Sequence, residues 1–301
     1  MSIEIRQFNL INGEGETYTL TVSNKYTGFL GIVDGLGYEK SPEYQKIGTE
    51  YEQLTNTINQ GVIAGTIQFF QPYAYQEFTR FARFCQDNDL TLYYQIPTGL
   101  FLKKGSITKI DKSEGNDSLR VKVEFTPKTL WYQEIEQKST QAFNGAIQHQ
   151  EEVTDPDTGV TTIQYVISGY SFEFDGVSVI SDSNIESPCH FAIKMPAYTG
   201  NLTWTQEVDG TQVMTGTLSN ITLSDGDVLH IRTDTNPYRI YKESSQGVQT
   251  DLYSKSDFST KRFPFIYKGV NTLDVSQVTL ADISGDDNYL SIEGKILYET
   301  V

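Results

Sequence analysis

Hydrophobic and polar positions alternate along most of this 301-residue chain, which predicts a mainly β protein. The alternation begins at once, in residues 3–5 and again in residues 18–22. Between them, residues 12–15 read Asn-Gly-Glu-Gly, and these residue types tolerate a positive φ. The opening of the chain is therefore expected to be a β-hairpin.

One segment has the spacing of a helix instead. Its apolar residues recur every three or four positions, at Ala74, Tyr75, Phe78, Phe81, Ala82 and Cys85. Pro72 suits a first helical position and Asn88 suits the end of a helix. Arg80 and Arg83 fall on the opposite face, toward the end where the helix dipole favours cations. We predict one amphipathic helix here.

Strand patterns surround this helix. Residues 63–70 precede it, residues 90–96 follow it, and a hairpin pattern covers residues 105–125. One helix covering a sheet makes a small α+β unit, which ends near Trp131 and Tyr132. The first domain is therefore expected to span residues 1–132.

The rest of the chain is expected to be a second, all-β domain spanning residues 133–301. Residues 133–145 show neither a helical nor a strand period and are interpreted as a linker. Short strand patterns then recur about every ten residues, separated by turn sequences such as Asp209-Gly210. That spacing is typical of a β-sandwich.

Residues 38–60 form a polar segment without a clear apolar face, interpreted as a long loop or hairpin. Tyr38, Tyr44 and Tyr51 are spaced through it. A surface segment of this length without a core is usually functional or disordered. We predict that it pairs with the next subunit of an oligomer through these tyrosines, because heterologous contacts close rings.

Residues 146–167 form a second hairpin pattern around an Asp-Pro-Asp-Thr-Gly turn. We interpret both of its faces as polar, and a hairpin that buries no face is only marginally stable alone. It is therefore expected to lie against a neighbouring protein, through Gln148, Gln150 and Glu152. An ordinary solvent-exposed hairpin is the alternative.

The net charge of −16 makes binding to nucleic acid or to an anionic membrane surface unfavourable. No apolar run approaches the roughly 20 residues of a membrane span. The first ten residues lack the features of a signal peptide, so the chain is expected to fold where it is made.

The sequence offers no catalytic, metal-binding or cofactor-binding motif. His149, His190 and His230 are far apart and lack metal-ligand spacing, and Cys85 and Cys189 are too few for a disulfide framework. Hydrogen-bonded structural histidines and buried cysteines are the expected interpretation.

Acidic pairs are the remaining enzymatic possibility, because glycoside hydrolysis needs two carboxylates across a cleft. The pairs are Asp155/Asp157, Asp225/Asp227 and Asp286/Asp287. Each lies in a turn sequence, where Asp bonds its own backbone, and this is the preferred interpretation. Trp204 is expected in the core between sheets, with stacking on a sugar ring as the alternative.

The order of elements resembles that of phage distal tail proteins, from tail tips and baseplates of phages with long non-contractile tails. The resemblance rests on residues 63–85, 90–94, 107–114 and 119–132 in the first domain, and on residues 218–234 and 263–275 in the second. It implies that the second domain is a galectin-like β-sandwich with a hairpin insertion around residues 146–167.

This resemblance implies a structural protein of the virion, without an active site, a metal or a cofactor. Such proteins form a homohexameric ring that joins the tail tube protein to the tail-associated hub or lysin protein, and they often anchor receptor-binding proteins. Folding would occur in the host bacterial cytoplasm, before assembly into the virion. A carbohydrate-binding adhesin and, less favoured, a glycoside hydrolase are the alternatives; a hexameric mass in solution would favour the tail protein.

Overall fold

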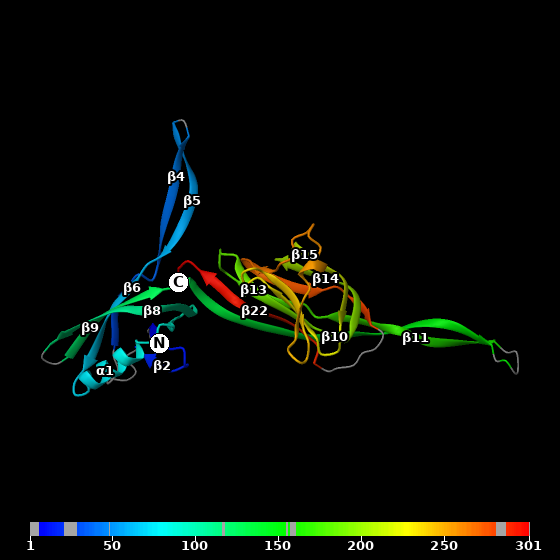
Figure 1. The fold of residues 1–301 in the computed structure, drawn as a ribbon, viewed down its shortest axis with the longest axis horizontal. Helices are drawn as coiled ribbons and strands as arrows, with labels where there is room; N and C mark the ends of the chain where they lie inside the picture. The colour runs from blue at the N-terminus through cyan, green and yellow to red at the C-terminus, as the bar shows by residue number, and fades with distance from the viewer. Residues whose placement is uncertain are drawn as a thin grey trace. The chain divides into compact units, whose positions relative to one another are not determined.

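The computed structural model describes residues 6–20, 29–47, 49–115, 118–154, 156, 161–280 and 287–300. The chain divides into two compact units. The first consists of Met1–Gln133 together with Leu297–Val301, and the second of Glu134–Ile296. Both are built mainly from antiparallel strands, as the alternation predicts (Figure 1).

The first unit has one helix and nine complete strands among its described residues. These are β1 (Gln7–Ile11), β2 (Thr17–Thr19), β3 (Phe29–Asp34), β4 (Tyr38–Ile47), β5 (Glu50–Gln60), β6 (Ile63–Phe70), α1 (Ala74–Phe84), β7 (Leu90–Ile96), β8 (Gly99–Glu114) and β9 (Ser118–Pro127). Seven of the strands pair in the order β2-β1-β7-β8-β9-β6-β3. The strands flanking the helix are therefore confirmed, and an opening hairpin is present with Gln7–Ile11 as its first arm. Residues 3–5, where the predicted alternation begins, lie outside the described residues.

Strand β8 is long enough to pair with two neighbours in succession. Its first half pairs with β7 and its second half with β9, and Gly105 is the residue shared by both ladders. A side chain at Gly105 would collide with the carbonyl oxygen of Thr126, so glycine is required for this close approach. The two halves of the sheet contribute to one buried cluster that includes Phe8, Ile67 and Val121.

Helix α1 packs on this core through most of the apolar face that its sequence spacing predicts. Ala74, Phe81 and Cys85 are buried, and the Phe81 ring lies 5.2 Å from that of Tyr18, whereas Tyr75 is 51% exposed. The helix begins at Ala74 and ends at Phe84.

Two details of the predicted helix are therefore wrong. Pro72 lies in the turn before the helix, two residues ahead of its first position, and Cys85, not Asn88, caps its end. The backbone N–H of Cys85 donates to the Phe81 carbonyl and so continues the helical pattern up to the cap.

The second unit contains most of β10 and all but the end of β22. Its elements are β10 (Trp131–Thr154), β11 (Thr161–Phe174), β12 (Val177–Ser181), β13 (Ser187–Lys194), β14 (Tyr198–Val208), β15 (Thr211–Leu223), β16 (Val228–Arg232), β17 (Arg239–Glu243), β18 (Gln249–Asp251), a 3₁₀ turn at Tyr253–Lys255, β19 (Phe265–Ile266), β20 (Gly269–Val275), β21 (Val278–Leu280) and β22 (Tyr289–Tyr298). One sheet has the order β12-β20-β14-β15, and the other runs β18-β17-β16-β13-β22.

Alternate residues of both sheets are buried, as expected for a sandwich. Phe191 and Leu290 in one sheet and Leu202 and Trp204 in the other are completely buried. The indole Nε1 of Trp204 donates to the carbonyl oxygen of Arg262 at 3.0 Å. Trp204 is thus a core residue, as preferred, and its ring is not available for stacking on a sugar.

The linker predicted at residues 133–145 is wrong, because these residues lie inside β10. Beyond residue 140 the strand pairs with β11, starting at Gln141 opposite Phe174. None of the side chains described at residues 133–139 is buried. A period of two appears only where one face of a strand is buried and the other is not, so this stretch of strand carries no such signal.

The last residues of the chain return to the first unit. The ring of Tyr298 packs edge-to-face on that of Phe101, with centroids 5.2 Å apart. Its hydroxyl donates to Oε1 of Gln133 at 2.7 Å. The first unit is therefore built from two stretches of chain, one on each side of the second unit in sequence.

Candidate functional site

Strands β4 and β5 form a hairpin that pairs with no other described strand (Figure 1). It occupies the segment that the sequence left open as a loop or a hairpin. Its described side chains at residues 41–47 and 49–54 are all exposed. The segment therefore has no core of its own, and a function in binding would require contacts with another molecule.

The register places the three predicted tyrosines on one face of this hairpin. Tyr44 lies opposite Gln53, and Tyr51 lies opposite Lys46. Strand β4 alternates without interruption, so Tyr38 points to the same side as Tyr44. We call this side, with Tyr38, Tyr44, Lys46 and Tyr51, the tyrosine face; its tyrosines are 39%, 57% and 68% exposed.

The opposite side of the hairpin is acidic. Gln45 pairs with Glu52, Ile47 pairs with Glu50, and Glu43 lies on the same side of β4 as Gln45. We call this side, with Glu43, Glu50 and Glu52, the glutamate face. The hairpin thus separates its described charges by face, with the lysine among the tyrosines and the glutamates on the other side.

A second hairpin extends from the second unit. Its strands are residues 146–154 of β10 and residues 161–167 of β11, which pair from Gln148 opposite Ile167 to Thr154 opposite Thr161. We call this pair of segments the outer hairpin. Nearer the body, β11 also pairs with β21, from Tyr170 opposite Leu280 onward.

The outer hairpin is not polar on both faces, which corrects the sequence prediction. Ile163, Tyr165 and Ile167 lie on one face and are 60%, 67% and 50% exposed. The predicted contact residues lie directly opposite them, in the pairs Gln148–Ile167, Gln150–Tyr165 and Glu152–Ile163. The structure thus brings Gln148, Gln150 and Glu152 together on one face.

The signal for this apolar row is present in the sequence. Residues 163, 165 and 167 alternate with polar or smaller residues at a period of two, which marks one face of a strand. The amide of Gln150 donates to the hydroxyl of Tyr165 at 2.9 Å and so orients the ring on this face. We refer to Ile163, Tyr165 and Ile167 as the apolar row.

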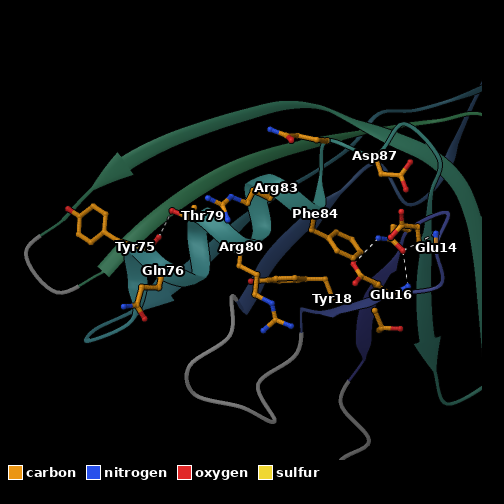
Figure 2. Close-up of a pocket in the computed structure, with 13 residues that line it drawn as sticks. Glu14, Glu16, Tyr18, Tyr75, Gln76, Thr79, Arg80, Arg83, Phe84 and Asp87 are labelled. Atoms are coloured by element: carbon orange, nitrogen blue, oxygen red, sulfur yellow. Dashed lines mark hydrogen bonds between the residues drawn. The ribbon is translucent and has the colours of Figure 1, made fainter.

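A groove lies between helix α1 and the β1–β2 turn (Figure 2). Tyr18 and Phe84 line it, with Arg80 and Arg83 contributed by the helix. Figure 2 shows acidic side chains gathered at its other end. They are Glu14, Glu16 and Asp87.

Hydrogen bonds fix the acidic end of the groove. Oδ1 of Asn12 accepts from the backbone N–H groups of Glu14 and Glu16, at 3.2 and 2.8 Å. Asp87 accepts from the N–H of Gly13 at 2.8 Å and of Asp89 at 2.9 Å. These backbone donors hold the pKa of the Asp87 carboxyl below its usual range, chiefly through Asp89.

Two of the histidines, far apart in sequence, meet on the second unit. Nε2 of His190 and Nδ1 of His230 are 2.8 Å apart, and the His230 ring stacks on Tyr241. One ring donates and the other accepts, so at least one of the pair is neutral. Burial lowers the pKa of both; that of His230, also beside His190, falls to about 4.

The other residues considered for chemistry have structural surroundings. Burial raises the pKa of the Cys85 and Cys189 thiols to about 12, which makes them unreactive near neutral pH. Asp227 accepts from the N–H of Ser224 within its turn and from Lys242 at 2.9 Å. Asp155, Asp157 and Asp286 lie outside the described residues.

The described residues contain neither a metal-binding cluster nor a membrane-spanning helix. Within them, no group of three His, Cys, Asp or Glu side chains is placed to hold a metal ion. No helix in the same part of the chain is both long enough and apolar enough to cross a membrane.

A known family model matches most of the first unit. Residues 7–128 match the family model described as "Distal tail protein, N-terminal domain". No curated protein matches the chain. The match spans nearly all of the first unit that precedes β10.

Two solved structures extend the likeness in fold to the whole chain. The chain is similar to the Dit protein (gp 19.1) of phage SPP1, with 12% identity, a TM-score of 0.56 and coverage of 96% of this chain and 99% of that chain. It is also similar to a chain of the phage P2 baseplate in its activated conformation with calcium, with 16% identity, a TM-score of 0.50 and coverage of 99% and 100%.

Proposed function

We propose that this chain is a phage distal tail and baseplate structural protein that forms a homohexameric ring at the tail tip, because residues 7–128 match the distal tail protein N-terminal domain. The ring joins the tail tube protein to the tail-associated hub protein. Receptor-binding proteins attach to its outside, through the second domain. That domain is a galectin-like sandwich acting as a scaffold, since a fold alone does not license sugar binding.

The β4–β5 hairpin supports ring formation through the first domain. It exposes Tyr44, Tyr51, Ile47 and Leu54 by more than half, yet no other described strand pairs with it. Exposed aromatic side chains at this density are typical of protein interfaces. A hairpin from one subunit and a different surface on the next make a heterologous contact, which closes into a ring when the rotation fits.

The outer hairpin supports attachment of a second protein. Its apolar row lies on a projecting ladder whose two strands pair only with each other beyond Gly169, among the described residues. Exposed apolar side chains framed by polar ones mark interaction sites. Gln148, Gln150 and Glu152 supply that polar frame, as hydrogen-bonding groups beside the row.

The experiment is a mass measurement on the full chain and on a hairpin-shortened variant. Light scattering or native mass spectrometry is expected to give a hexamer for the full chain. A variant with residues 40–55 replaced by a two-residue turn is expected to be a folded monomer. A variant with the outer hairpin shortened in the same way is the matched control and is expected to remain a hexamer.

Two results would contradict the proposal. A full chain that stays monomeric at micromolar concentration would contradict ring formation. If the variant without residues 40–55 is still a hexamer and has the same thermal unfolding temperature as the full chain, the β4–β5 hairpin is not part of the interface.

A further inference from the structure

Helix α1 presents two arginines on the surface of a strongly acidic chain. Arg80 and Arg83 are exposed and lie three residues apart, so their side chains are neighbours on the helix. Within the described part of the chain, neither forms an ion pair. The guanidinium of Arg80 lies over the Tyr18 ring, 5.9 Å from its centroid, and both residues line the same groove.

The groove beside these arginines has two unlike walls. The helix supplies the positive wall, and Glu14, Glu16 and Asp87 supply the negative wall, with Tyr18 and Phe84 among the lining residues (Figure 2). Its volume of about 1120 Å³ exceeds the roughly 300–1,000 Å³ of small-molecule sites. A segment of protein with two differently charged faces matches this arrangement.

The β4–β5 hairpin of a second copy has those two faces. Its tyrosine face offers Lys46 and three phenolic hydroxyls to carboxylates, and its glutamate face offers Glu43, Glu50 and Glu52 to guanidinium groups. Arg–carboxylate pairs can be bidentate, which fixes the orientation of the partner.

We infer that the β4–β5 hairpin of one copy docks in the α1 groove of the next copy. Its tyrosine face contacts the wall of Glu14, Glu16 and Asp87, and its glutamate face contacts Arg80 and Arg83. The inference rests on the proposed ring and adds the second half of its interface. Each copy then contributes one hairpin and one groove, which is a heterologous contact.

A charge exchange tests the pairing in the full chain. The double variant R80E/R83E is expected to lose the hexamer, with at least a tenfold rise in the dissociation constant between copies. The variant E50K/E52K is expected to behave in the same way. Combining all four substitutions restores opposite charges and is expected to restore the hexamer.

The matched control is R120E/K122E, which makes the same charge change on exposed residues of β9. It is expected to remain hexameric. Thermal unfolding of every variant shows whether it is folded. Because the contact is between charges, the wild-type hexamer is also expected to weaken as salt rises from 0.05 to 0.5 M, roughly from a Debye length above 10 Å to below 5 Å.

Mixing two defective chains gives a second readout. The chain without residues 40–55 keeps its groove, and R80E/R83E keeps its hairpin. Their mixture is expected to form one-to-one complexes, whereas each alone stays monomeric. A mixture that stays monomeric would overturn the docking.

Different variants separate the docking contact from the ring itself. If R80E/R83E remains a hexamer while removal of residues 40–55 gives monomers, the groove is not the docking site and the ring proposal stands. A four-residue exchange that does not restore the hexamer, although it is folded, also overturns the pairing. If neither R80E/R83E nor removal of residues 40–55 disturbs the hexamer, the β4–β5 hairpin is excluded from the interface and both proposals are wrong.

Discussion

The two hairpins of this chain are built alike and differ in what their faces display. Each is a ladder whose strands pair only with each other among the described residues, over β4–β5 in one case and over the outer hairpin in the other. The β4–β5 hairpin sorts its described charges, with Lys46 on one face and Glu43, Glu50 and Glu52 on the other. The outer hairpin sorts apolar from polar, with its apolar row on one face.

This difference suggests two kinds of binding. Segregated charges set the orientation and the rate of association more than its strength, and salt weakens them. An apolar row contributes through buried area and is insensitive to moderate salt. The first pattern suits identical copies that must be placed in one orientation, and the second suits firm attachment of a different protein.

The largest expected effect comes from removing the outer hairpin. Replacing residues 148–167 with a two-residue turn is expected to abolish co-assembly with the receptor-binding or hub protein. The hexamer is expected to stay intact, because the ring contact belongs to the β4–β5 hairpin. Co-purification with the partner and mass measurement check the two outcomes. Unchanged co-assembly would mean that this hairpin is merely solvent-exposed.

A smaller change isolates the apolar row. Replacing Ile163 and Tyr165 with serine is expected to weaken partner binding about 100-fold, equivalent to about 3 kcal/mol, since large apolar anchors dominate interface energies. The matched control is Thr162→Ala with Gln164→Ala on the opposite face, where less than a threefold change is expected. Calorimetric titration measures both, and equal losses for the two variants would rule out a face-specific contact.

The smallest expected effect is on stability and comes from His230, which lies in the second unit outside both hairpins. The folded-state pKa of His230 is about 4, below the roughly 6.5 of an unfolded histidine. The unfolded chain therefore binds more protons between these values, and the free energy of unfolding falls as the pH drops through this window. After allowance for the partial exposure of the ring, the expected loss is about 1–2 kcal/mol.

Urea unfolding at pH 7 and pH 4.5 measures this loss. His230→Gln is expected to reduce the pH dependence, and Gln246→Ala, at an exposed position with no titratable side chain, is the control that should leave it unchanged. Equal pH dependence in His230→Gln and the wild type would show that the pair does not contribute. Neither substitution is expected to alter the hexamer.

The sequence predicts those elements in which one face is buried. Strands 63–70 and 90–96 have the predicted bounds, because their alternation reflects burial against one core. The helix was predicted from the same kind of pattern. Its ends depend on backbone geometry, so the ends predicted from Pro72 and Asn88 were wrong. Residues 133–145 gave no period because none of the side chains described within them is buried.

Most of the candidate site required the register and the packing. The tyrosine and glutamate faces depend on which residue of β4 lies opposite which residue of β5, and a bulge between Glu43 and Tyr44 shifts that register. The groove joins the β1–β2 turn to the end of α1 through the bond from Gly13 to Asp87, 74 residues apart. The apolar row alone could have been predicted, from the period of residues 163–167.

The return of Tyr298 to the first unit has a consequence for the order of synthesis. Domains generally fold from the N-terminus as the chain emerges from the ribosome. Here the first unit lacks Tyr298, and its contacts with Phe101 and Gln133, until all of residues 134–296 have been translated. A nascent chain therefore completes its first unit only after its second unit has been made, which delays full maturation of the early domain to the end of translation.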